Sequence, residues 1–87
     1  MKIKTFPDLK QKVTFHLVDD EAQKELYRSD RLSDMWTFLK QLTISENLTI
    51  EEKENNKLVY VFNAEYFMNK FSLIDNVPLS LQSINPL

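Results

Sequence analysis

The chain contains no glycine and no cysteine, and it has a single histidine among its 87 residues. At average usage a chain of this length carries about six glycines. Their absence excludes phosphate-binding loops, dinucleotide-binding GxGxxG turns and GxSxG nucleophile elbows, which all need glycine backbone. The lack of cysteine excludes thiol catalysis, disulfides and cysteine-ligated zinc. One histidine excludes the HExxH zinc pair, so we expect no metal and no cofactor.

The chain is short enough to form one small domain over residues 1–87. Apolar residues make up 43% of it, which can supply a core, although stability should then be low or depend on self-association or a partner. No apolar run reaches the roughly 18 residues that span a bilayer, and the first residues lack the apolar stretch of a signal peptide. We therefore expect a cytoplasmic protein with no membrane partner.

The net charge of −2 is unevenly distributed along the chain. Residues 1–18 hold four lysines against one aspartate, whereas residues 19–55 hold ten acids against five bases. Nucleic-acid-binding domains usually present a basic face, so an acidic middle argues against a nucleic-acid partner. A protein partner with a basic surface is the better expectation.

Hydrophobic patterning predicts three elements in the first half of the chain. Apolar and polar residues alternate over residues 12–18, which predicts a strand after an extended lead-in at 1–11. The acids that follow are candidate caps for a short helix over 20–28. Apolar residues then recur at helical spacing and predict an amphipathic helix over 31–43, with Leu32, Met35, Trp36, Leu39 and Leu42 on one face.

The segment from Thr49 to Phe71 allows two interpretations. Thr49 and Glu52 form a capping-box pattern, and an apolar stripe continues to Phe71, which predicts one long helix over 50–73. Residues 57–62 are rich in strand formers, so the alternative is a hairpin arm there followed by a helix over 63–73. The absence of glycine favours polar breaks between helices over tight hairpins, so we favour the long helix. The predicted fold class is mainly α, with a short N-terminal strand, two or three helices and a C-terminal tail.

Residues 76–87 form an extended apolar tail that carries no charge. Two prolines argue against a helix there. Either the tail packs back onto the helices and completes a small core, or it adds to a partner or to a second copy of the chain.

No combination of nucleophile, base and orienting group is visible in the sequence, so we do not expect an enzyme. His16 lies on the polar side of the predicted strand with no nucleophile or acid at a local spacing, so it is interpreted as a solvent-facing or locally hydrogen-bonded residue. The candidate partner-binding residues come from the tryptophan helix, the second acidic cluster and the tail. They are Trp36, Glu51, Glu52, Glu54, Leu79, Leu81 and Ile84.

The strand-like run 13–21, the Met35–Leu39 segment around the tryptophan and a last amphipathic helix ending near Asp75 resemble a group of small proteins encoded by tailed bacteriophages. The resemblance spans about residues 12–75. It implies a phage or prophage accessory protein that acts inside a bacterium, with no catalytic residues to carry over.

These observations predict a non-enzymatic protein-interaction module that binds and modulates a host or phage protein, for example as an inhibitor of a host defence nuclease. One alternative is a helix-turn-helix DNA-binding regulator built from 20–28 and 31–43, although the second helix offers only Arg31 and Lys40 as basic groups. Another alternative is a structural homo-oligomer or virion component.

Overall fold

A computed structural model describes residues 12–84, so the predicted lead-in at 1–11 and the last three residues of the tail lie outside the described residues. These described residues form four strands, two short α-helices and two 3-10 helices. In chain order they are β1 (Val13–Asp19), β2 (Lys24–Ser29), α1 (Leu32–Leu39), β3 (Leu48–Glu54), β4 (Lys57–Asn63), α2 (Ala64–Lys70), η2 (Ile74–Asn76) and η3 (Leu81–Ser83).

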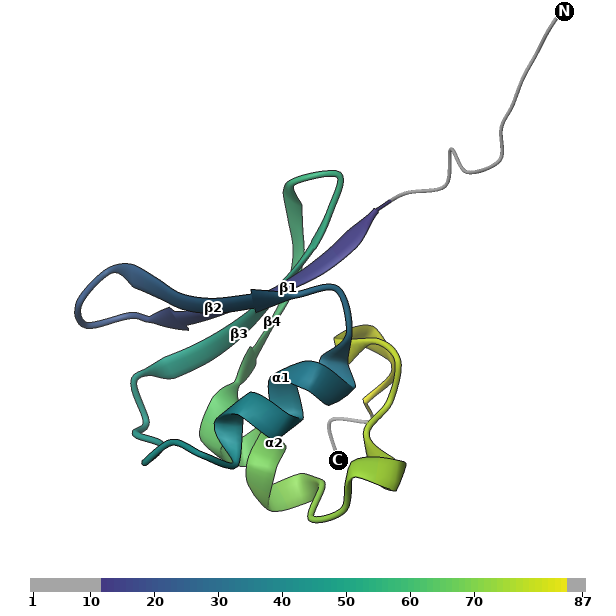
Figure 1. Ribbon diagram of the computed structural model, residues 1–87. Helices are drawn as coiled ribbons and strands as arrows, with labels where there is room; N and C mark the ends of the chain where they lie inside the picture. The colour runs from purple at the N-terminus through teal and green to yellow at the C-terminus, as the bar shows by residue number, and fades with distance from the viewer. Residues whose placement is uncertain (1–11, 85–87) are drawn as a thin grey trace, which may run out of the picture.

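The four strands form one antiparallel sheet in the order β2-β1-β3-β4. Both helices and the C-terminal segment lie on the same side of this sheet (Figure 1). No element within residues 12–84 covers the other side, which we call the open side. The predicted fold class of mainly α is therefore wrong. No helix within residues 12–84 combines the length and apolar character needed to cross a bilayer.

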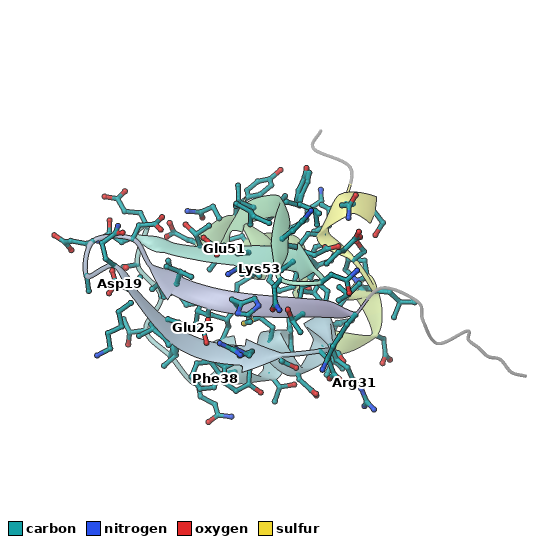
Figure 2. All side chains as sticks on the ribbon, turned by 90° about the horizontal axis from the view of Figure 1, so that it is seen from above. Asp19, Glu25, Arg31, Phe38, Glu51 and Lys53 are labelled. Carbon is teal, nitrogen blue, oxygen red and sulfur yellow. The ribbon has the colours of Figure 1, made fainter. Side chains whose placement is uncertain are left out.

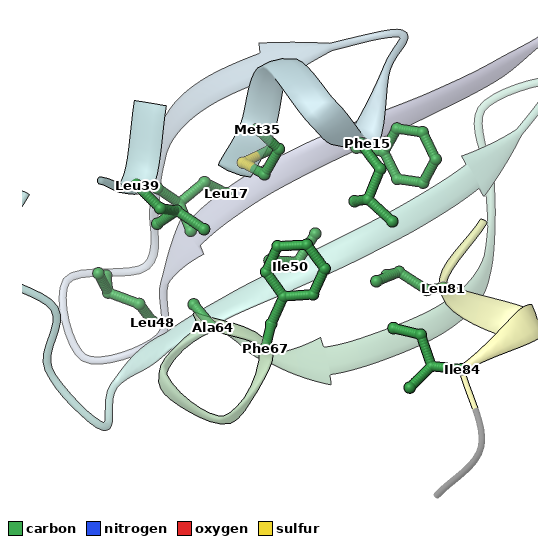
Figure 3. Packing of buried hydrophobic residues seen from close by; sticks show 11 residues of the cluster. Phe15, Leu17, Met35, Leu39, Leu48, Ile50, Ala64, Phe67, Leu81 and Ile84 are labelled. Atoms are coloured by element: carbon green, nitrogen blue, oxygen red, sulfur yellow. The ribbon is translucent and has the colours of Figure 1, made fainter. Parts of the chain in front are cut away.

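The core lies between the sheet and the two helices (Figure 3). Alternation along β1 and β3 turns Phe15, Leu17 and Ile50 toward the helices, where each is at most 1% exposed. The helices contribute Leu32, Met35, Leu39, Ala64 and Phe67 to the same cluster. One buried face of a sheet covered by short helices is a stable two-layer arrangement.

The predicted strand at 12–18 is confirmed as β1, but the predicted helix at 20–28 is wrong because these residues form a turn and β2. The Asp19 carboxylate accepts hydrogen bonds from the backbone N–H groups of Glu21 and Ala22, at 3.0 and 3.1 Å, so it caps a turn and not a helix. Tyr27 of β2 stacks on Phe38 with ring centroids 4.1 Å apart. Pairing with β1 and this packing outweigh a weak helical pattern.

The predicted helix at 31–43 is observed as the shorter α1. The stripe that predicted it is confirmed at Leu32, Met35 and Leu39, which are buried. Trp36 is half-buried beside them, and its ring N–H donates to the Phe71 carbonyl oxygen at 2.6 Å.

The predicted long helix at 50–73 is wrong, and the hairpin alternative holds: β3 and β4 are joined by Asn55 and Asn56, and α2 follows directly. Both asparagines have positive φ, at 53° and 69°, which is the conformation that two-residue hairpin turns require. Asparagine tolerates this left-handed region better than other non-glycine residues. Asn63 then caps α2 by accepting from the Tyr66 N–H at 2.9 Å.

The predicted extended tail at 76–87 begins at the last residue of η2 and contains η3, so it is not extended throughout. Leu81 and Ile84 are buried, at 0% and 4% exposure, so the tail packs back onto the core at these two positions. Leu79 is 93% exposed and takes no part in this packing.

We predict that Asn56→Ala lowers the free energy of unfolding by about 1 kcal/mol, because alanine pays the full cost of the left-handed conformation. Chemical denaturation measures the difference. The matched control is Asn76→Ala in η2, which should change stability by less than about 0.5 kcal/mol. An increase in stability with Asn56→Ala would contradict the hairpin, because alanine stabilises the interior of a helix.

Candidate functional site

The open side of the sheet carries a group of polar side chains (Figure 2). Thr14 and His16 lie on this side because residues of a strand alternate between its two faces, and Phe15 and Leu17 occupy the core side. Glu25 of β2 lies on one side of β1, and Glu51 and Lys53 of β3 lie on the other.

His16 links a hydroxyl group and a carboxylate. Its Nε2 lies 2.8 Å from the Thr14 Oγ1, and its Nδ1 lies 2.8 Å from the Glu25 Oε1. The histidine is only 3% exposed although it is on the open side, because its neighbours enclose it. Glu25 also accepts from the Arg28 Nε at 3.0 Å. Thr14, His16, Glu25 and Arg28 therefore form one continuous polar network.

The protonation of Glu25 follows from this network. The hydrogen bond from His16 lowers the pKa of the Glu25 carboxyl below 4.5, Arg28 lowers it further, and partial burial opposes the shift. Glu25 is therefore ionised at neutral pH. An ionised carboxylate can only accept, so the His16 Nδ1–H donates to Glu25, and Nε2 is left to bond with the Thr14 hydroxyl.

The sequence interpretation of His16 missed this network. A structural irregularity after Leu17 shifts the β1–β2 register and pairs Val18 with Glu25, and the acid comes from nine residues further along the chain. Only a correct assignment of 20–28 as turn and strand would have brought the histidine and the acid together.

The order of hydroxyl, imidazole and carboxylate matches the connectivity of a catalytic triad. In such triads the nucleophile is exposed, often on a sharp turn. Thr14 instead lies in a central strand and is half-buried, and its hydroxyl is on a branched carbon. This setting suits a positioned hydrogen-bonding group better than a nucleophile.

A hollow of about 340 Å³ opens beside this network. Its lining comes from the start of β1, the end of β2 and the β3–β4 turn. It consists of Lys12, Thr14, His16, Arg28, Asn55 and Asn56. Within residues 12–84 no group of three His, Asp or Glu side chains is placed to hold a metal ion.

The three acids predicted to bind a partner do not form one surface. Glu51 points to the open side, whereas Glu52 is 1% exposed on the core side, because the segment is a strand and not a helix. Glu54 is half-buried on the same side as Glu52. Of the predicted tail residues, only Leu79 is available to a partner, since Leu81 and Ile84 are buried.

Glu52 holds the C-terminal segment instead. Its carboxylate accepts from the Ser80 hydroxyl at 3.0 Å, from the Leu81 backbone N–H at 2.7 Å and from the Gln82 side-chain amide at 2.9 Å. These donors satisfy a buried charge without a cation. The carboxylate thus fixes η3 where Leu81 and Ile84 enter the core.

Sequence reasoning also missed an exposed apolar group on β4. Leu58, Val59 and Val61 are 55%, 39% and 50% exposed. β4 is an edge strand, so its outer backbone groups have no partner strand within the described part of the chain. The strand-forming residues at 57–62 could have predicted this edge strand from the sequence.

We predict that Glu52→Gln lowers the free energy of unfolding by about 2–4 kcal/mol, because several charge-assisted hydrogen bonds are lost or weakened around a buried group. Amide hydrogen exchange should show reduced protection of the Leu81 N–H. The control is Glu54→Gln, whose carboxylate is only within 3.5 Å of the Gln82 amide and should matter much less. Equal losses in the two variants would contradict the role of Glu52.

A second prediction concerns pH. Because the pKa of Glu25 is lowered in the folded protein, its stabilisation is fully present above the carboxyl pKa of the unfolded chain and is lost as the pH falls through the lower folded value. Glu25→Gln should therefore reduce stability by up to about 1 kcal/mol at pH 7, with the difference shrinking toward pH 3.

Thermal and denaturant unfolding at pH 7, 5, 4 and 3 measures this difference. Glu46→Gln is the control, since its side chain is outside the network and should show no such trend. A Glu25→Gln difference that grows as the pH falls would contradict the assignment.

Comparison with family models, with curated proteins and with solved structures finds no match to this chain. The resemblance to small phage proteins is therefore still a prediction.

Proposed function

We propose that this protein is a non-enzymatic protein-interaction module that pairs through strand β4, and that its partner strand is β4 of a second copy. The observation that carries the proposal is the exposed apolar edge formed by Leu58, Val59 and Val61. Edge strands that stay monomeric are usually protected by charge. The opposite edge, β2, has Lys24, Glu25 and Arg28, whereas residues 58–63 contain no charged residue.

The sequence of β4 suits pairing with itself. An antiparallel pair centred on Val61 places the two Val61 side chains together on the open side. It also places Tyr60 opposite Phe62 of the other copy on the core side, and aromatic cross-strand pairs are favourable. No like charges meet in this register. The extra residue Val59 interrupts the β3–β4 ladder, so pairing would use the regular half of the strand.

The other predicted functions have less support. A helix-turn-helix needs two consecutive helices, but residues 24–29 form strand β2. An acidic surface that occupies a basic channel needs acids on one face, and Glu51 and Glu52 point to opposite faces. Under the phage resemblance, a self-assembling module of this kind would act in the cytoplasm of the bacterial host.

We predict that the protein dimerises with increasing concentration and that Val61→Lys keeps it monomeric, because two lysines would meet at the centre of the pair. Sedimentation equilibrium or light scattering from about 5 to 500 µM measures this. Leu79→Lys is the matched control, since it makes the same change at a more exposed leucine outside β4, and it should still dimerise.

Two outcomes would overturn the proposal. A protein that stays monomeric over the whole concentration range does not pair with itself. Dissociation by Leu79→Lys but not by Val61→Lys would assign the interface to the C-terminal segment and not to β4.

A further inference from the structure

The hollow beside His16 has a lining with one common property. None of its six residues is an acid. Thr14 and His16 are already bonded to each other, and the other four, Lys12, Arg28, Asn55 and Asn56, have side chains that can donate hydrogen bonds to a ligand. Lys12 and Arg28 are cations, so the hollow has two positive charges at its walls. Glu25, the acid that contacts the lining, is already bound by His16 and Arg28. A lining of this composition favours an anionic ligand.

The Arg28 side chain is held in place by Glu25. Glu25 accepts from the Arg28 Nε at 3.0 Å and lies 3.5 Å from its Nη2, which orients the guanidinium group. Within the described residues, Nη1 makes no hydrogen bond. Glu25 therefore leaves one end of the planar donor group available to an anion.

The β3–β4 turn is joined to the start of β1 by two hydrogen bonds. The Asn55 N–H donates to the Lys12 carbonyl oxygen at 2.9 Å, and the Lys12 N–H donates to the Asn55 Oδ1 at 3.2 Å. Because Oδ1 is the acceptor, the Asn55 Nδ2 retains its donors. These bonds hold the turn, with its two amide side chains, against the Lys12 backbone at the wall of the hollow, and this pre-organisation lowers the cost of binding.

We propose that this hollow binds the phosphate group of a small phosphorylated molecule. A phosphate has several oxygens in tetrahedral directions, and the donors of Lys12, Arg28 and the β3–β4 turn come from three separate segments of the lining. Lys12 and the free end of the Arg28 guanidinium supply the positive charge that attracts it. The hollow's volume of about 340 Å³ is at the lower end of the range for small-molecule sites, so it has room for the group that carries the phosphate. This inference does not depend on pairing at β4.

The test uses the complete chain, with ribose 5-phosphate, inorganic phosphate and unphosphorylated ribose as probes, at constant ionic strength set with NaCl. Two-dimensional NMR should show saturable shifts for the backbone amides of Lys12, Thr14, Arg28 and Asn56 with both phosphate probes, and none with ribose. Lys12→Gln should weaken Kd at least about tenfold, the effect of one charge-assisted hydrogen bond.

Lys57→Gln is the matched control, because it removes the same charge next to the same turn from a residue outside the lining. It should leave Kd within about twofold. Arg28→Gln should weaken binding as Lys12→Gln does, with circular dichroism confirming that both variants fold.

Shifts that do not saturate, or equal weakening by Lys57→Gln and Lys12→Gln, would overturn the site, since both indicate diffuse attraction to positive charge. Tighter binding of ribose 5-phosphate than of inorganic phosphate supports the small organic ligand. Equal affinities for ribose 5-phosphate and inorganic phosphate would overturn the assignment of an organic ligand and identify the free phosphate ion as the ligand.

Discussion

The left-handed turn at Asn55 and Asn56 is the constraint on which the rest of the structure depends. It reverses the chain after β3, so β4 becomes the edge of the sheet and its apolar residues become exposed. It also brings the turn against Lys12, which builds one wall of the hollow. Replacing the turn with a helix would remove both surfaces together. The two proposed binding regions are therefore consequences of one local backbone choice.

A small core also needs the C-terminal segment, and a polar contact holds that segment in place. The helices cover Ile50 on the core side of β3, and the C-terminal segment covers Glu52 further along the same strand. The segment supplies Leu81 and Ile84 to the core and three kinds of donor to the carboxylate. Breaking such a contact leaves a buried carboxylate without hydrogen-bond partners. The free-energy cost of that state is larger than the net stabilisation that the hydrogen bonds contribute. This asymmetry makes Glu52 a strong determinant of where the chain end packs.

The sequence could predict elements whose pattern has one interpretation. Alternation at 13–17 identifies β1, and helical spacing from Leu32 to Leu39 identifies α1. The sequence-based prediction failed where the hydrophobic pattern fits two periodicities. The segment from Leu58 to Phe71 is compatible with one helical stripe and also with a strand followed by a helix. The absence of glycine was taken as evidence against tight hairpins. In the structure, Asn55 and Asn56 adopt the positive φ angles that glycine would otherwise supply in the turn. The candidate site depended on those elements, so its His16–Glu25 contact could not be predicted once 20–28 was assigned to a helix.

The open side of the sheet combines these results. An antiparallel sheet can leave one face uncovered when that face is polar. Here His16 of β1 and Glu25 and Arg28 of β2 give the open side its polar character. A buried imidazole must have partners for both ring nitrogens, and Thr14 and Glu25 provide them. Glu25 also takes two nitrogens of the Arg28 guanidinium, so the donors that remain for a ligand of the hollow come from Lys12, the Nη1 end of Arg28 and the turn. These remaining donors are the reason why we propose an anionic ligand for the hollow.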